Sequence, residues 1–512
     1  MGSNDKKGTI KHLNFLLTFM NSIKKLLRKI NARMEDKYSS SFLALVVTFI
    51  AALVTANILF LPNYLGVAGD GSTDDIMNAA GIYYLGDDSD DNYNNYFLKT
   101  YSRIAAGGQE PSNTFNSQVV IIKIAAVIDD MVTRDNYFDI RFLGLLYTIM
   151  FLPAVYLFIK QVCNRVKRFS EIIVIAAAGL LIFSDVGYVT YFNSFYPEAI
   201  WFITMLYCVA FAMSFQGNQS CGRDLLNLAF FIGAAVILTG TRRQCAVLGF
   251  IFSVYCIRLI FIRRNWIWGA SCAGGAFALS ILSIACLLSY KPDFSEISKF
   301  HAMTRGVLFE SVNPADTLAE FGIDPSYELL ADASAYDYLP LVKAGDDSLY
   351  QGFMDKYTIE DITVYYLQHP GSLLGMLDVS ISSGMNLRRS NCGNYEKSVG
   401  LPKMARSLFW SAWSTFKLTS APRTIGYLFI LTAGIVLLFY KGYSIRPLED
   451  RRSTVFLDML LMVLAVLLVQ AITVILNSGD AEMIQRTFLV GFGLDIMTYC
   501  VFAELLHKIN IV

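Results

Sequence analysis

Long apolar segments recur along this chain and constrain its fold more than any other feature. A helix needs roughly 20 mostly apolar residues to cross about 30 Å of hydrocarbon, and in lipid only helices and closed barrels pair every backbone group. Ten segments predict membrane-spanning helices: 41–62, 141–160, 171–188, 199–216, 225–241, 245–263, 266–290, 423–440, 454–476 and 487–506. The sequence therefore predicts an all-α membrane protein with about ten transmembrane helices.

The composition agrees with a membrane protein that also has a water-facing part. Of the 512 residues, 54% are hydrophobic and only 16% are charged, whereas soluble domains carry about a quarter charged residues. The 42 basic and 42 acidic residues cancel, which argues against a nucleic-acid partner. The nine cysteines include no C-x-x-C spacing, so we predict no metal site of that type.

The spacing of the apolar segments divides the chain into four parts. Residues 1–40 form a basic arm, either a cytoplasmic helix or one lying on the membrane surface. Residues 41–290 hold spans one to seven, with a first outer loop at 63–140. Residues 291–422 form a larger external helical domain, and 423–512 hold spans eight to ten. Lys and Arg concentrate in the arm and in alternate loops, which predicts a multi-pass cell-membrane protein with both termini in the cytoplasm.

The first outer loop begins with an acidic, glycine-containing motif. Asp70 stands between Gly69 and Gly71, so the backbone can turn tightly there and leave the carboxylate open. Asp74 and Asp75 follow, and both suit the first turn of a helix over 72–84, where a carboxylate is a good cap without any further role. The acidic run at 87–91 is typical of a solvated turn, and whether a divalent cation binds in this loop stays open.

The link between the third and fourth predicted spans is aromatic, with a few polar groups. An interfacial aromatic belt explains its Tyr and Phe residues. It does not explain Asn193, Glu198 or the membrane-embedded Asp185. These three residues form either a sugar-binding cluster or a structural one.

Several arginines on the outer side oppose the positive-inside trend. Arg242 and Arg243 sit at the tip of a tight hairpin, where they would bind a phosphate or pair with Asp185, Glu198 or Asp480. Arg486 lies four residues after Glu482, a spacing that also suits a helical ion pair.

The large external segment adds further basic residues, and span ten adds an acidic one. Lys299, His301, Arg305, Arg388 and Arg389 lie close to span ends, and we select Arg305 and Arg388 as substrate-binding candidates. Asp495 falls near the middle of the last span, so it should face a partner within the bundle.

These motifs together resemble the GT-C type of polytopic glycosyltransferase, which uses polyprenyl-phosphate sugars. The resemblance rests on GDGSTDDIMNAAGIYY at 69–84, YFNSFYPEA at 191–199, FHAMTRGVLFESVNPADTLAEFGID at 300–324 and SGDAEMIQRTFLVGFGLD at 478–495. The last motif departs from the family pattern at Arg486, where a Lys or His is expected. The resemblance implies a GT-C-like fold and an acidic catalytic base in the first outer loop, with Asp70 as first candidate and Asp74 as second.

The expected function follows from this resemblance and from the polar groups. It is an inverting transfer of a sugar from a polyprenyl-phosphate donor to an acceptor glycan or glycolipid on the outer face of the membrane, as in cell-wall polysaccharide synthesis. Arg242, Arg243 and Arg486 would bind the donor phosphate, and Asn193, Glu198, Arg305 and Arg388 the substrates. The alternative is a transporter or flippase for lipid-linked glycans that uses Asp185 and Asp495. A non-catalytic scaffold is a third hypothesis.

Overall fold

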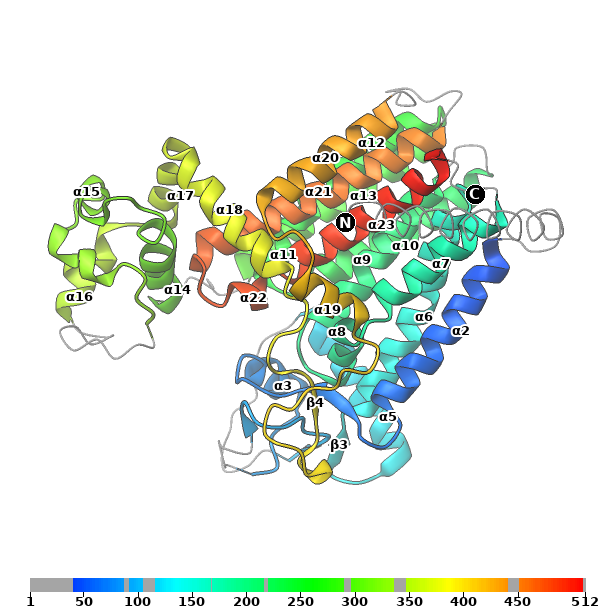
Figure 1. Cartoon of the computed structure of the whole chain (residues 1–512), viewed down its shortest axis with the longest axis horizontal. Coiled ribbons are helices and arrows are strands. Elements are labelled where there is room, and N and C mark those ends of the chain that lie inside the picture. Colours follow the sequence, from blue (N-terminus) through cyan, green and yellow to red (C-terminus); the bar gives the residue numbers. More distant parts are fainter. Residues whose placement is uncertain are drawn as a thin grey trace, which may run out of the picture.

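The computed structural model describes residues 40–86, 92–104, 116–166, 168–215, 220–289, 296–335, 347–440 and 451–509. Most of these residues are helical (Figure 1). The predicted amphipathic arm, apart from its last residue, and the acidic run at 87–91 lie outside the described residues.

All ten apolar segments form helices, but they differ in length. Seven helices of the described chain are long and apolar enough to cross a membrane. They are α2 (Ser40–Leu59), α6 (Arg141–Cys163), α10 (Cys221–Thr239), the continuous segment Arg243–Ile262 with α11 (Arg243–Ala246) and α12 (Leu248–Leu259), α13 (Trp266–Ser289), α21 (Arg451–Ser478) and α23 (Phe488–Ile509). An eighth span would join α7 (Phe169–Phe183) to α8 (Val186–Val189) and the 3₁₀ turn Thr190–Asn193 across a 44° bend.

The two remaining segments, α9 (Glu198–Ser214) and α20 (Ile425–Phe439), are shorter. At ~1.5 Å per residue they are about 26 Å and 22 Å long, less than the ~30 Å of a bilayer core. In α9 every residue except Tyr207 is buried, because α6, α10 and α21 pack around it. Hydropathy alone predicted ten spans because a helix buried in protein is as apolar as one facing lipid.

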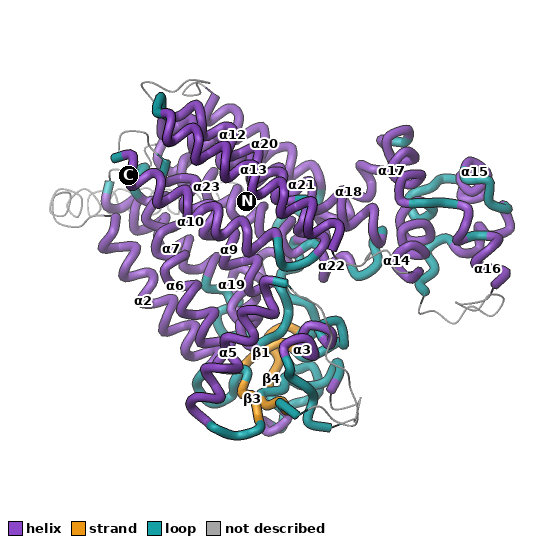
Figure 2. The backbone as a smooth tube through the Cα atoms, turned by 180° about the vertical axis from the view of Figure 1, so that it is seen from behind, coloured by secondary structure: helices purple, strands orange, loops and turns teal. Residues whose placement is uncertain are grey.

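Two lobes project from one end of the helical bundle. The β lobe consists of the described residues of 64–139 together with 388–411, and it lies at the bottom of Figure 1. It contains β1 (Leu65–Val67), α3 (Asp74–Ala80), β2 (Thr100–Ser102), α5 (Ser117–Thr133), β3 (Tyr137–Asp139) and β4 (Cys392–Tyr395). Figure 2 shows the strands gathered in this lobe.

Antiparallel pairing joins distant parts of the chain within the β lobe. β2 pairs with β3, and β1 pairs with β4, so that Leu65 lies opposite Tyr395. The predicted external domain at 291–422 is therefore divided in space, because its residues 388–411 pack on the first outer loop. The 3₁₀ helix Lys397–Val399 lies within residues 388–411, and α19 (Ala412–Thr419) follows them toward the bundle.

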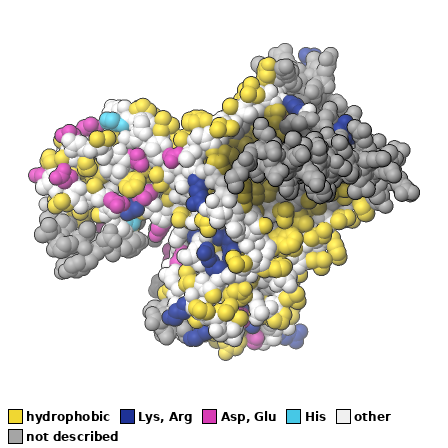
Figure 3. All heavy atoms as spheres, viewed as in Figure 1, with side chains coloured by type: hydrophobic (Ala, Val, Ile, Leu, Met, Phe, Trp, Pro, Cys, Tyr) yellow, Lys and Arg dark blue, Asp and Glu magenta, His cyan; other side chains and the backbone are white. Residues whose placement is uncertain are grey.

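The helical lobe consists of residues 296–335 and 347–368, on the left of Figure 1. Its elements are α14 (Glu296–His301), the π-helical turn Ala302–Val307, α15 (Pro314–Glu320), the 3₁₀ turn Pro325–Leu330, α16 (Asp347–Gly352), the 3₁₀ turn Met354–Lys356 and α17 (Ile359–Gln368). α18 (Pro370–Gly384) then returns to pack on α21 and α23 near α22 (Met483–Arg486). Acidic side chains gather on this lobe, and hydrophobic side chains spread over the bundle (Figure 3).

Candidate functional site

Asp70 lies in a tight turn directly after β1. Gly71 has φ +85°, a left-handed conformation that favours glycine. The backbone N–H and hydroxyl of Ser72 donate to Asp70 Oδ1 over 3.0 and 2.6 Å. Asp70 Oδ2 accepts from Gln485 Nε2 at 3.2 Å and lies 4.0 Å from Arg389 Nη1. The carboxylate is therefore held by its own turn, while its second oxygen faces groups from distant segments.

A buried ion pair lies beside this carboxylate. Arg389 Nη2 pairs with Glu198 Oε1 at the start of α9, and the two side chains are 7% and 2% exposed. The Arg389 guanidinium also lies over the rings of Tyr191 and Tyr196, 5.7 and 5.2 Å from their centroids. These contacts fix the direction of the guanidinium, because both its charge and its flat face are engaged.

Asn391 ties the returning segment to the Asp70 turn. Its Nδ2 donates to the Ala68 carbonyl at 3.0 Å and to the Tyr196 hydroxyl at 3.3 Å. The Ala68 N–H in turn donates to the Asn391 carbonyl at 2.9 Å. Residues two positions before Asp70 and two after Arg389 are thus linked in both directions.

Asp70, Glu198, Arg389 and Asn391 together form a polar cluster. Three of its buried polar atoms have no hydrogen-bond partner within the described residues: Glu198 Oε2, Arg389 Nη1 and Asn391 Oδ1. Each such atom costs about 1–3 kcal/mol if it stays unpaired. Two of them accept hydrogen bonds and one donates. This combination is suited to water or to a ligand that carries hydroxyl groups and an oxygen acceptor.

Asp74, the second candidate base, lies at the start of α3 with two tyrosines. Tyr93 and Tyr84 donate to its two oxygens over 2.7 and 3.2 Å. Burial raises the pKa of Asp74 above its ordinary value, and the tyrosine hydrogen bonds partly oppose this. Asp75 beside it is exposed.

Two of the predicted substrate-binding residues, Asn193 and Arg388, hydrogen-bond to backbone carbonyls of the protein. Asn193 is buried and its Nδ2 donates to the carbonyls of Leu59 and Leu65, joining the end of α2 to β1. Arg388 donates to the Ser407 carbonyl at 2.8 Å and to the Cys392 carbonyl at 3.4 Å. Their roles toward a substrate stay predictions.

Arg305, the other predicted substrate-binding arginine, connects the helical lobe to the bundle. Its Nε and Nη2 bind the two oxygens of Asp480 over 2.7 and 2.8 Å, and its Nη1 lies 2.7 Å from Asp332. Asp480, which the sequence offered as a partner for the hairpin arginines, thus pairs with Arg305.

The predicted phosphate-binding arginines occupy two places. Arg242 and Arg243 lie at the junction of α10 and α11, and both are partly buried. Next to them, Thr241 accepts from Trp201 Nε1 at 2.8 Å. Arg486 pairs with Glu482 at 3.1 Å, and the residue before it is Gln485, which binds Asp70.

Three residues of the site were not selected from the sequence. Gln485 and Arg389 lie next to Asp70, and Asn391 binds the Ala68 carbonyl in the same turn. Arg389 was grouped with the other basic residues near span ends, of which Arg388 was selected. Local signals were weak: Arg389 neighbours Arg388, and Gln485 precedes Arg486 in the last motif. Glu198, by contrast, was selected and does lie in the cluster.

The intramembrane aspartates are engaged inside the bundle. Asp495 Oδ1 lies 2.9 Å from Lys417 Nζ on α19, and its Oδ2 accepts from Trp413 Nε1 at 2.9 Å and from the Tyr188 hydroxyl. The expectation that Asp495 faces a partner in the bundle is confirmed. Asp185 accepts from backbone N–H groups at the starts of α8 and α19, and so caps both helices.

Metal ligands are not clustered in the part of the chain that the structure describes. There, no three His, Cys, Asp or Glu side chains come close enough to hold an ion. Whether the protein uses a divalent cation therefore stays an open question.

The fold and this site define a class: a multi-pass helical membrane protein with a polar cluster where a lobe meets one end of the bundle. Within that class, the chain belongs to the family described as the YfdI N-terminal transmembrane domain, whose family model matches residues 22–512. No curated protein is significantly similar to the chain in sequence.

Two solved structures of an archaeal oligosaccharyltransferase from Archaeoglobus fulgidus are distantly similar. The first, AglB in complex with an inhibitory peptide and a dolichol-phosphate, has a TM-score of 0.36 and 10% identity over 90% of this chain and 50% of that one. The second, tethered to an acceptor peptide through a disulfide bond, has a TM-score of 0.37 and 13% identity over 90% and 49%. This chain thus spans about half the length of those proteins.

Proposed function

We propose that this protein is an integral-membrane glycosyltransferase that moves a sugar from a polyprenyl-phosphate donor to an acceptor glycan. The supporting observation is the cluster around Asp70, in which a half-buried carboxylate lies beside three buried polar atoms that have no hydrogen-bond partner among the described residues. A sugar offers hydroxyl donors for Glu198 Oε2 and Asn391 Oδ1. A sugar or phosphate oxygen offers an acceptor for Arg389 Nη1.

The proposed chemistry is one displacement with inversion. An acceptor hydroxyl attacks the anomeric carbon, and Asp70 takes its proton as general base. The bond between the acceptor oxygen and the anomeric carbon forms while the bond from that carbon to the phosphate oxygen breaks. The electron pair leaves on the polyprenyl phosphate, whose growing charge a preorganised guanidinium stabilises.

Arg389 is suited to this last role because its guanidinium is already fixed by Glu198 and the two tyrosines. Arg242, Arg243 and Arg486 remain proposed contacts for the donor phosphate. The reaction is proposed for the outer face of the membrane, at the bundle end that carries both lobes.

The flippase alternative needs intramembrane carboxylates that a substrate or proton can reach. Asp495 is 1% exposed and Asp185 is fully buried, and protein groups donate hydrogen bonds to both. Both carboxylates are thus buried as well as hydrogen-bonded, whereas the Asp70 side chain is 13% exposed. This difference favours a structural role for Asp185 and Asp495, and so supports the enzyme over the transporter.

The test is sugar transfer by purified protein from a radiolabelled polyprenyl-phosphate hexose to acceptors in a membrane extract. Asp70→Asn keeps the turn but cannot take the proton, so transfer should fall by at least about 100-fold, the scale of general-base catalysis. Asp75→Asn is the matched control, because Asp75 is exposed in the same loop. It should transfer like the wild type.

Donor binding measured in parallel separates the outcomes. Loss of transfer by Asp70→Asn with donor binding retained supports the base. Wild-type transfer rates in Asp70→Asn would refute it, whatever the donor binding. Donor binding without transfer by the wild type, against a complete acceptor extract, would favour a flippase or a binding protein.

A further inference from the structure

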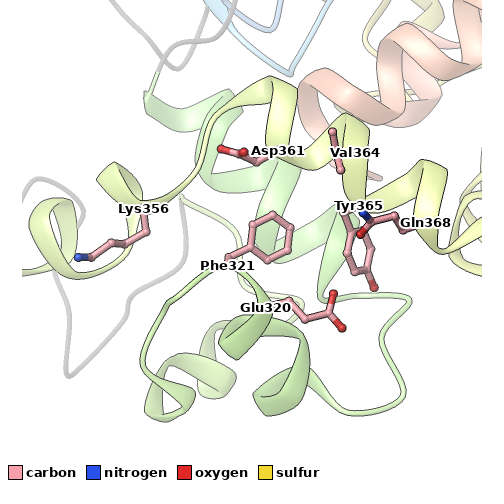
Figure 4. A pocket seen from close by; sticks show the side chains of 7 residues that line it. All are labelled: Glu320, Phe321, Lys356, Asp361, Val364, Tyr365 and Gln368. Atoms are coloured by element: carbon pink, nitrogen blue, oxygen red, sulfur yellow. The ribbon is translucent and has the colours of Figure 1, made fainter.

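The helical lobe carries a cleft of its own. Its volume is about 230 Å³, and it lies between α15, the 3₁₀ turn before α17 and α17 itself (Figure 4). Seven side chains line it: Glu320, Phe321, Lys356, Asp361, Val364, Tyr365 and Gln368. None of them belongs to the cluster around Asp70, which lies in the other lobe.

One wall of the cleft is aromatic. The Phe321 and Tyr365 rings lie 5.6 Å apart at an interplanar angle of 41°, and His369 stacks on Tyr365 at 4.3 Å. Tyr365 is only 5% exposed and His369 covers one of its faces, so Tyr365 supports the wall from behind. Phe321 is partly exposed and is the ring that a ligand can reach. Flat ring faces of this kind pack against the C–H faces of sugar rings, which are apolar although their rims carry hydroxyl groups.

Polar side chains surround this aromatic wall. Glu320, Lys356, Asp361 and Gln368 are all exposed. Asp361 uses Oδ2 to cap α17, accepting from the Thr358 N–H and hydroxyl, and its Oδ1 accepts no hydrogen bond from the described residues. Within the described residues Gln368 makes no side-chain hydrogen bond, so its amide offers both donors and an acceptor.

The aromatic wall and the polar side chains of the cleft together favour a neutral ligand rich in hydroxyl groups. Two carboxylates against one lysine disfavour a phosphate or another anion, and the acidic surface of the lobe adds to this. A charged rim disfavours an isoprenoid chain. Pockets that enclose drug-sized ligands are roughly 300–1,000 Å³, so this smaller cleft would hold about one sugar unit, and the rest of an oligosaccharide would lie outside it.

We propose that this cleft is a binding site for a neutral oligosaccharide, which stacks on Phe321 and hydrogen-bonds to Glu320, Asp361 and Gln368. The role of this site as an anchor for the acceptor glycan rests on the proposed transferase function. The binding of an oligosaccharide in the cleft does not depend on that function. The lobe would hold a distal part of the acceptor while its end reaches the cluster at Asp70.

The experiment measures binding of glucose-, galactose- and mannose-based neutral tetrasaccharides to the full-length protein in detergent, by saturation-transfer difference NMR and calorimetry. The wild type should bind at least one of them, and inorganic phosphate should not displace it. Gln368→Ala and Glu320→Ala should each weaken the affinity about tenfold, the effect of one lost hydrogen bond of the stronger kind. Glu360→Ala is the matched control, because Glu360 is exposed on α17 but does not line the cleft.

Each outcome decides the proposal. No binding of any tetrasaccharide by the wild type overturns it, and so does binding that Gln368→Ala and Glu320→Ala leave unchanged. Displacement by phosphate also overturns it and indicates an anion site. Asp70→Asn should bind like the wild type, so a failure of the transferase proposal would leave binding at the cleft intact and distinguishable.

Discussion

The buried ion pair of Lys417 and Asp495 tests whether the polar groups inside the bundle serve stability or function. Lys417 Nζ lies 2.9 Å from Asp495 Oδ1, and the side chains are 0% and 2% exposed. Lys417→Met keeps the length of the side chain but leaves a carboxylate without its cation. Breaking one partner of a buried pair costs about 3–5 kcal/mol, so we expect Lys417→Met to lower the free energy of unfolding by that amount.

A second substitution should restore most of this loss. In Lys417→Met with Asp495→Asn both charges are gone, and the Asn oxygen still accepts from Trp413 Nε1 and the Tyr188 hydroxyl. The remaining cost is the Lys417 hydrogen bond to the Gly491 carbonyl, about 1 kcal/mol. The double variant should therefore be more stable than Lys417→Met by roughly 2–4 kcal/mol.

The assay is denaturant-induced unfolding of the three proteins in the same detergent, with sugar transfer measured below the unfolding transition. If the charges of Lys417 and Asp495 act only by stabilising the bundle, the folded double variant should keep its transfer activity. The reasoning fails if Lys417→Met is as stable as the wild type, or if the double variant is no more stable than Lys417→Met. A folded double variant that has lost transfer would mean that the pair takes part in function, and the transporter hypothesis would return.

Two further predictions concern packing and pH. A methyl group on Gly491 would overlap the carbonyl of Gly384 where α23 meets α18, so Gly491→Ala should destabilise the protein by about 1–3 kcal/mol. Gly434→Ala is the control, because no atom lies near the added methyl group, and it should not destabilise the protein. Equal unfolding midpoints of the two variants would contradict this. Burial lowers the pKa of His301 below 6.5, and its Nε2 accepts from the Ala335 N–H at 3.0 Å. The unfolded state therefore binds the proton more readily, and the stability of the helical lobe should fall as the pH drops below about 6.5. Unchanged protection factors for the amides of residues 301–335 between pH 7.5 and 5.5, after correction for the intrinsic exchange rates, would refute it.

The sequence predicted the helices well because apolar length is a local property. Each of the ten segments is helical, since lipid and protein interiors impose the same demand for paired backbone groups. It could not separate spans from the buried helix α9, because burial by α6, α10 and α21 depends on the assembled bundle. The bend of 44° after α7 was equally invisible, although Asp185, which caps the next helix, marks its position.

The candidate site was only partly predictable, for a reason of chain connectivity. The Gly-Asp-Gly motif indicated Asp70 from three neighbouring residues. Its contacts come from far away: Gln485 is 415 residues along the chain, and Arg389 is brought near by the pairing of β1 with β4. Strands of three and four residues carry little sequence signal, so nothing local predicted that pairing.

The neighbours Arg388 and Arg389 show why residue type alone could not resolve the site. The sequence selected Arg388 as a substrate-binding candidate because it lies near a span end, and that role stays a prediction. Arg388 donates to the carbonyls of Cys392 and Ser407 and so holds the returning segment in place. Arg389, carried by that segment, pairs with Glu198 and extends Nη1 toward Asp70. The first arginine builds the loop and the second faces the site, a division that appears only once the two ends of the β lobe meet.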